Sequence, residues 1–260
     1  MSLIPKTVLG RTGLEVTRLG YGTTGQPQPK QHWDRLFNTI LDAGLNFIDT
    51  ANDYGVNWGG PAESNIGLSI STRRSEYYIA TKCGCAAPGP HVWTRDNAFR
   101  GLHESLQRLR TDYIDVMQYH NPTIEECITG DLVLALQDMK QQGKVRWIGL
   151  STTLPELPTF LEWDVFDVFQ VPYSALEREH EKWITKAGEA GVGMIVRGAV
   201  AQGDPDNVSE LDQNHENKWS LYAAAGLDEL RENGDSRIAF MLRYILTHPY
   251  THTNIVKTVS

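Results

Sequence analysis

The sequence has few cysteines, no long apolar segment and no concentration of positive charge. Its three cysteines, Cys83, Cys85 and Cys127, are too few for the disulfide framework of a small secreted protein and favour a reducing compartment. No stretch approaches the roughly 20 apolar residues that span a bilayer, and the N-terminus lacks the apolar core of a signal peptide. We therefore expect a cytoplasmic protein that is not inserted in a membrane.

Positive charge is also scarce. The 260 residues include 24 Lys and Arg against 32 Asp and Glu, a net charge of −8, and no Lys/Arg-rich run occurs. Proteins hold nucleic-acid phosphates mainly through such runs, so we do not expect a nucleic-acid partner. Hydrophobic residues make up 40% and charged residues 22%, which is typical of a folded globular protein.

Segments of strand character and helix character alternate along the chain. Eight short runs of apolar, β-branched or aromatic residues are candidate strands, at 17–21, 45–49, 77–81, 113–118, 145–150, 166–171, 192–196 and 253–256. Segments between them have helical spacing of apolar residues, as at Trp33, Phe37 and Leu41. This alternation predicts an α/β protein, a (β/α)8 TIM barrel that forms one domain over residues 1–260.

The two ends of the predicted barrel differ from the repeating units. Residues 6–9 and 14–17 flank Gly10-Arg11-Thr12-Gly13 and predict an N-terminal β-hairpin that closes the bottom of the barrel. The last candidate strand ends four residues before Ser260, which leaves no sequence for an eighth covering helix. Because an uncovered strand would expose apolar surface, we expect that a C-terminal helix is missing from this sequence.

Four polar residues lie at or just beyond the C-terminal ends of predicted strands, where barrels of this kind place their active sites. Asp49, Lys82 and His120 each close a strand, and Tyr54 lies in the loop five residues after Asp49. A Lys ammonium favours the phenolate of a neighbouring Tyr, a carboxylate stabilises the buried ammonium, and an imidazole donates to a polarised carbonyl oxygen. Each residue alone also suits a purely structural position, but together they predict carbonyl reduction with Tyr54 as proton donor.

Dispersed sequence strings resemble the aldo-keto reductase family along nearly the whole chain. They are NFIDTANDYG at 46–55, IATK at 79–82, SLQRLRTDYID at 105–115 and GKVRWIGLS at 143–151. The resemblance implies a (β/α)8 barrel and a catalytic tetrad of Asp49, Tyr54, Lys82 and His120. It also implies that hydride comes from C4 of a nicotinamide.

The same resemblance implies a set of cofactor contacts at the nicotinamide end. These residues are Gly22, Thr23, Thr24, Asp49, Ser151, Thr152, Gln170, Arg197 and Gly198. The family usually has Ser-Asn where this chain has Ser151-Thr152. Many members have a stacking aromatic at the position of Arg197, and a guanidinium also stacks flat on a ring.

Other residues concern the adenosine end of the cofactor and the substrate. Lys257 and Thr258 resemble the segment that binds the adenosine 2′-phosphate, which favours NADP(H) as cofactor. Trp58 and Trp93 lie in loops after Tyr54 and Lys82, where each either walls the pocket of a small carbonyl substrate or is a surface aromatic. The identity of this aldehyde or ketone and the oligomeric state cannot be read from the sequence.

Two other motifs lack the context that their function requires. Residues 20–25 match G-x-G-x-x-G, but Pro27 and Pro29 follow and prevent the helix that opens a dinucleotide-binding βαβ unit. Zinc ligation by Cys83, Cys85, His91 and Cys127 lacks a second closely spaced ligand pair, so no metal is expected.

The sequence therefore favours an NADPH-dependent reductase of aldehydes or ketones, with two alternatives left open. One is an NADP(H)-binding regulatory or auxiliary subunit that keeps the tetrad and turns over slowly, as in the potassium-channel β subunits that resemble this family. The other is a barrel hydrolase or isomerase that uses the carboxylates of Asp49 and Asp53.

Overall fold

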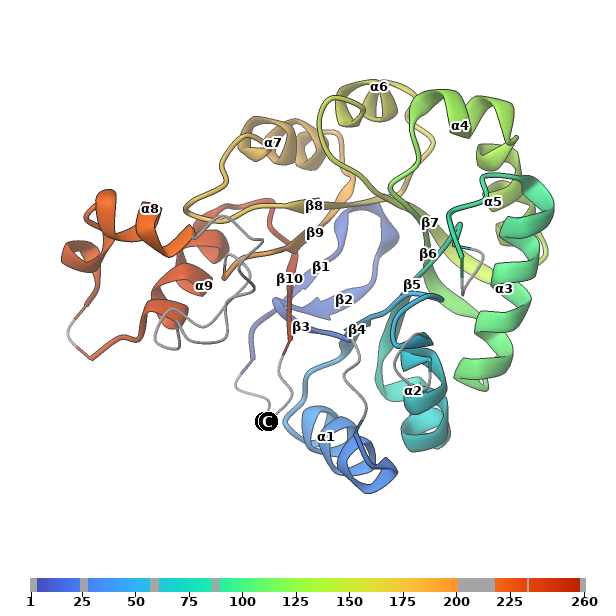
Figure 1. Ribbon diagram of the computed structural model, residues 1–260, viewed down its shortest axis with the longest axis horizontal. Helices are drawn as coiled ribbons and strands as arrows, with labels where there is room; N and C mark the ends of the chain where they lie inside the picture. Colours follow the sequence, from blue (N-terminus) through green and yellow to red (C-terminus); the bar gives the residue numbers. More distant parts are fainter. Residues whose placement is uncertain are drawn as a thin grey trace.

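A closed barrel of eight parallel strands forms the centre of the protein, with helices around its outside (Figure 1). The computed structural model describes residues 4–23, 28–56, 61–85, 89–200, 218–232 and 234–257. Around the barrel the strands follow the order β10-β3-β4-β5-β6-β7-β8-β9. They are β3 (Leu19–Gly22), β4 (Phe47–Asp49), β5 (Tyr78–Cys83), β6 (Ile114–His120), β7 (Val145–Ser151), β8 (Val168–Pro172), β9 (Gly193–Arg197) and β10 (Thr253–Val256). The predicted (β/α)8 barrel is confirmed, and the strand ends lie within two residues of the predicted ranges.

The connecting helices pack on the barrel through faces of helical periodicity. They are α1 (Lys30–Asp42), α2 (Ala62–Ile70), α3 (Arg95–Leu109), α4 (Ile124–Thr129), α5 (Leu132–Gln141), α6 (Leu157–Glu162), α7 (Glu181–Glu189), α8 (Lys218–Ala224) and α9 (Arg237–Thr247). In α1 the buried residues are Trp33, Phe37 and Leu41, spaced by four. Gly44 and Gly143, which follow α1 and α5, have φ angles of +87° and +73°. These left-handed positions let the chain turn from a helix into the next strand.

An N-terminal hairpin closes one end of the barrel, as predicted. Its strands β1 (Lys6–Val8) and β2 (Glu15–Thr17) pair antiparallel across a short 3₁₀ helix at Gly10–Thr12. Behind them, Leu9, Leu14 and Val16 are buried against an apolar layer inside the barrel, formed by Phe47, Ala80, Val116, Val168 and Ile195. Water is therefore excluded from this end of the barrel interior.

The interior changes from apolar to polar within two residues along the strands. Successive side chains of a strand point to opposite faces, so the next inward position after each residue of the apolar layer lies two residues further on. Those positions carry Asp49, Lys82, Gln118, Gln170 and Arg197. A layer of polar side chains is thereby placed at the C-terminal ends of the strands, directly above the apolar layer.

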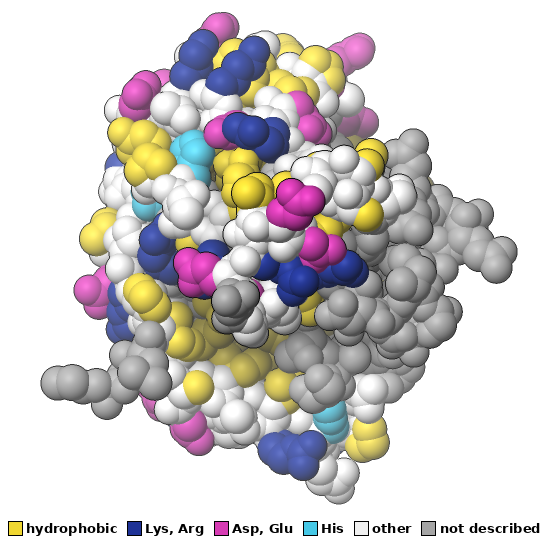
Figure 2. Space-filling model, turned by 90° about the vertical axis from the view of Figure 1, so that its left-hand side faces the viewer, with side chains coloured by type: hydrophobic (Ala, Val, Ile, Leu, Met, Phe, Trp, Pro, Cys, Tyr) yellow, Lys and Arg dark blue, Asp and Glu magenta, His cyan; other side chains and the backbone are white. Residues whose placement is uncertain are grey.

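The segment between β9 and β10 carries α8 and α9, which lie together on one side of the barrel (Figure 1). On this side of the molecule, basic and acidic side chains lie close together rather than in separate patches (Figure 2). Within the segment, Asp228 forms ion pairs with Arg231 and Arg237 at 2.8 and 2.7 Å. The described residues end at Lys257, one residue after β10, so the expectation about a further helix falls outside them. Among the described helices, none has the length and apolarity required to cross a bilayer.

Candidate active site

A buried ion pair between Lys82 of β5 and Asp49 of β4 lies at the centre of the polar layer. Lys82 Nζ is 2.6 Å from Asp49 Oδ2, and the two side chains are 1% and 2% exposed. The ammonium also donates to the backbone carbonyl of Thr50 at 2.9 Å, while Asp49 Oδ1 accepts from the Gln170 amide at 2.8 Å. Burial opposes the ammonium form of Lys82, but Asp49 and Tyr54 together raise its pKa above the usual value. Lys82 therefore stays charged inside the barrel.

Tyr54 lies beside this pair in the turn that follows β4. Its ring centroid is 5.2 Å from Lys82 Nζ, and the turn is held by a hydrogen bond from the Ala62 amide to the Tyr54 carbonyl at 2.8 Å. Burial raises the pKa of the phenol above its ordinary value, while the charge of Lys82 acts in the opposite direction. The phenol is therefore neutral at pH 7, with a positive charge nearby that stabilises its deprotonated form.

His120 ends β6 and faces Tyr54 from the neighbouring side of the site. The two rings meet edge to face with centroids 5.8 Å apart. Burial and the charge of Lys82 lower the pKa of His120 to about 4, although Asp53 acts in the opposite direction. At pH 7 the imidazole is consequently neutral, so one ring nitrogen carries a proton and the other is an acceptor.

A pocket opens above the tetrad between the ends of several strands. It has a volume of about 190 Å³ and is lined by Gly22, Thr23, Asp49, Tyr54, Gln170, Arg197, Ile255, Val256 and Lys257. Two of these side chains are cationic, Arg197 and Lys257. Gln170 Oε1 is buried and accepts no hydrogen bond from the described residues, so it offers an acceptor to a bound amide. These features fit a nicotinamide dinucleotide, whose carboxamide donates hydrogen bonds and whose phosphates are anionic.

The remaining predicted site residues either do not line this pocket or lie outside the described residues. Ser151 and Thr152 are buried at the end of β7, where Ser151 pairs with Gln170 in the strand register. Gly198 follows Arg197 with a φ of +74°. Trp93 lies between β5 and α3 and stacks on His91 with ring centroids 5.0 Å apart. Thr24, Trp58 and Thr258 lie outside the described residues.

Several residues that contact the tetrad were not predicted from the sequence. The Gln118 amide approaches Asp49 Oδ1 at 3.4 Å, and Cys85 Sγ lies 3.9 Å from Nδ1 of His120. A signal for Gln118 was present, because it precedes His120 by two residues and so points to the same face of β6. Cys85 gave no comparable signal, since its proximity to His120 depends on the pairing of β5 with β6.

A (β/α)8 barrel with a charge pair, a phenol and an imidazole at the C-terminal ends of its strands has the framework of a barrel enzyme. The profile of the Aldo/keto reductase family matches residues 18–260, and the chain belongs to that family. The resemblance inferred from the sequence strings is thereby confirmed. Aldo/keto reductases are oxidoreductases that use nicotinamide cofactors and act on small molecules.

Individual relatives agree with this assignment. Aldo-keto reductase YhdN of Bacillus subtilis is 30% identical in an alignment that covers 94% of this chain and 81% of the relative. The NADH-specific methylglyoxal reductase of Escherichia coli is 30% identical over 230 residues, covering 76% and 68%. The holo form of an aldo-keto reductase from Bacillus halodurans superposes with a TM-score of 0.86 at 27% identity, covering 99% of this chain and 87% of that one.

Proposed function

We propose that this protein reduces an aldehyde or ketone to an alcohol with NADPH, and that Tyr54 supplies the proton. One observation carries the proposal. The buried Lys82–Asp49 pair lies against Tyr54 at the edge of a pocket that offers both cations and a free amide acceptor.

A nicotinamide cofactor, when bound in this pocket, would supply the hydride that the carbonyl carbon accepts. The carbonyl oxygen then gains negative charge and takes the phenolic proton of Tyr54, so that an alcohol and a phenolate result. Lys82 stabilises the phenolate, and Asp49 holds the ammonium in place at 2.6 Å. His120 is neutral and keeps its single ring proton, and this N–H group donates a hydrogen bond to the oxygen during the reaction.

The preference for NADPH over NADH rests on Lys257. Its side chain lines the pocket at the end of β10, and an ammonium offers three donors to a phosphate. One relative is specific for NADH, so the preference needs a direct test. We expect Lys257→Met to weaken NADPH binding about tenfold, because one charge-assisted contact is lost, and to leave NADH binding nearly unchanged.

The proposed reaction is tested by single-turnover oxidation of protein-bound NADPH with a panel of aldehydes, ketones and sugars. We expect Tyr54→Phe to fold and to bind NADPH with unchanged affinity, and to slow oxidation at least about 100-fold. Tyr113→Phe is the matched control, because Tyr113 precedes β6 and contacts Arg146 away from the pocket. Oxidation by Tyr54→Phe at the wild-type rate would rule out Tyr54 as the proton donor.

The same assay separates the enzyme from a binding subunit. Rapid oxidation with one class of substrate supports the reductase. Tight binding of NADPH with negligible oxidation across the panel would favour a regulatory or auxiliary subunit instead. We also propose a cytoplasmic location, because all three cysteines are free thiols and buried. Cell fractionation with an antibody against the chain tests this location.

A further inference from the structure

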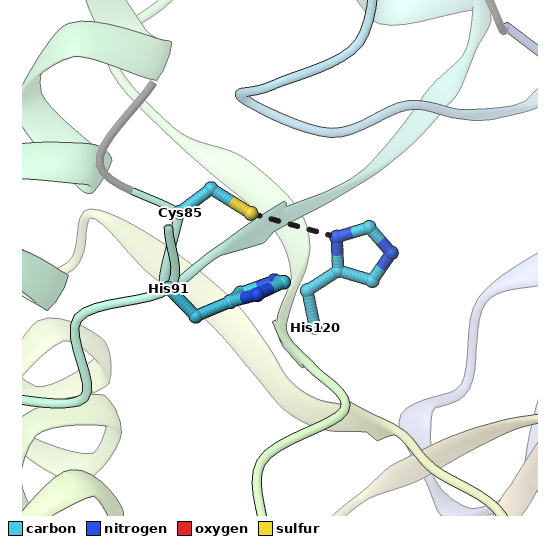
Figure 3. Close-up of side chains that lie close together, drawn as sticks. All are labelled: Cys85, His91 and His120. Carbon is cyan, nitrogen blue, oxygen red and sulfur yellow. Dashed lines mark hydrogen bonds between the residues drawn. The ribbon is translucent and has the colours of Figure 1, made fainter. Parts of the chain in front are cut away.

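The side chains of Cys85, His91 and His120 lie close together beyond the ends of β5 and β6. Cys85 and His91 lie on the two arms of the loop after β5, and both point toward His120 of β6 (Figure 3). One ligand atom from each side chain lies within 4.8 Å of the other two, and Cys85 Sγ is 3.9 Å from His120 Nδ1. A tetrahedral zinc ion places its sulfur and nitrogen ligands roughly 3.4–3.6 Å apart. The three ligand atoms therefore need to close by at most about 1.4 Å to hold one ion.

We propose that Cys85, His91 and His120 form a binding site for a zinc-class divalent cation at the rim of the catalytic pocket. Thiolate and imidazole are the ligands that such ions prefer, and a water molecule would fill the fourth position of the tetrahedron. Asp53 Oδ1 lies outside this group of three but is 3.7 Å from His120 Nδ1, so a negative charge is available beside a bound cation. A set of one thiolate and two imidazoles leaves one position of a tetrahedral shell open to water.

The surroundings hold the ligands in place before an ion arrives. The Asn52 amide donates to the carbonyl of Cys85 at 2.9 Å, and the Asn97 amide donates to the carbonyls of Gly84 and Val92 at 3.2 and 2.7 Å. Trp93 stacks on the His91 ring with an interplanar angle of 12°. The loop arms and the His91 ring are therefore oriented by contacts that do not depend on a metal, which lowers the entropy cost of binding.

The three ligands differ in their exposure to solvent. His91 is exposed to solvent, whereas Cys85 is buried and His120 lies between them in exposure. The His91 side of the site is therefore the side that is open to an ion from solvent. Zinc ligation would tie up Nδ1 of His120 and fix the ring proton on Nε2. This last consequence rests on the proposed function, but metal binding itself requires none of the chemistry proposed above.

Cobalt(II) is a suitable probe because its visible and near-ultraviolet absorption reports tetrahedral geometry and thiolate ligation. The purified full chain, without substrate, is titrated with Co²⁺ and then with Zn²⁺ as competitor. We expect d–d bands of tetrahedral intensity and a thiolate-to-cobalt charge-transfer band, both abolished by one equivalent of Zn²⁺. Isothermal titration with Zn²⁺ gives the affinity and the stoichiometry.

Substitutions assign the ligands. We expect Cys85→Ser to remove the charge-transfer band, and Cys85→Ser and His91→Gln each to weaken Zn²⁺ binding at least about tenfold. Cys127→Ser is the matched control, because Cys127 is a buried thiol of α4 outside the cluster, and it should bind as the wild type does. His91→Gln should also keep its NADPH affinity. Absence of the charge-transfer band in the wild type, or its retention in Cys85→Ser, would overturn the proposal, whatever the activity of the protein.

Discussion

The environment of Lys82 shows how a charge is kept inside an apolar fold. The ammonium is 1% exposed and loses most of its hydration, a loss that Asp49 and the Thr50 carbonyl replace with two short contacts. Gln170 in turn holds Asp49 from β8. Three strands therefore fix the position of one charge, and the same contacts place it next to Tyr54.

Removal of this charge is expected to affect stability and turnover separately. Lys82→Met leaves the Asp49 carboxylate buried without a cation and should lower the free energy of unfolding by about 3 kcal/mol, measured by urea denaturation. The double variant Asp49→Asn/Lys82→Met removes both charges and should regain most of that loss, because a neutral amide needs no counterion. Neither variant should turn over. Equal stability of the single and double variants would contradict a structural role for the pair.

At the scale of elements, strand positions could be predicted because each strand carries a short β-branched or aromatic run that ends near a turn residue. The proximity of Asp49, Tyr54, Lys82 and His120 could be predicted for a related reason: parallel strands in a barrel bring their C-terminal ends together. Contacts between side chains on opposite sides of the barrel could not be predicted in this way. The hydrogen bond from Gln170 to Asp49 joins residues on β8 and β4, and no local pattern in the sequence specifies which inward side chains meet.

The proximity of Cys85 and His91 to His120 was missed for a further reason. In the sequence, the three cysteines and His91 were considered together as metal ligands because Cys83, Cys85 and His91 lie close together in the chain. His120 lies on another strand, β6, so its spacing in the sequence gave no reason to include it. The register of β5 with β6 pairs Cys83 with Tyr119, which brings the residues that follow each strand to the same rim. Register is set by the packing of whole strands and cannot be read from the spacing of a few polar residues.

The hairpin is the element whose contribution to stability is most easily isolated. Leu9 is 0% exposed against the apolar layer, whereas Val8 beside it is 50% exposed. We expect Leu9→Ala to lower the free energy of unfolding by about 3 kcal/mol, because a cavity is left at the barrel bottom. Val8→Ala in the same hairpin should change it by less than about 0.5 kcal/mol. Similar losses in the two variants, measured by urea denaturation, would show that the hairpin does not pack as described.

At the scale of the whole molecule, buried histidines connect stability to pH. Burial is the main cause of a lowered pKa at His120, His180, His248 and His252, and it brings His120 and His252 to about 4. The His252 ring accepts a hydrogen bond from the Met194 amide at 3.0 Å, which requires its neutral form. The folded state therefore binds fewer protons than the unfolded state between pH 6.5 and about 4.

Folding stability is accordingly expected to be complete above pH 6.5 and to fall as the pH drops toward 4. We expect a loss of about 2 kcal/mol or more between pH 7 and pH 5, measured by urea denaturation at each pH. His252→Asn keeps an acceptor for the Met194 amide and removes one titrating group, so its profile should be flatter. A wild-type profile that is level over this range would contradict the neutral, buried state of these rings.

The two-residue step from the apolar layer to the polar layer also bears on how this chain can change during evolution. Deletion of one residue inside β6 would turn Gln118 and His120 away from the barrel axis and toward the surrounding helices. A gain or loss of the same size in a loop at the barrel rim would leave every inward side chain where it is. Strand length is therefore tightly constrained by the packing of this protein, while the loops at the barrel rim tolerate changes of length that would reshape the rim without moving the polar layer.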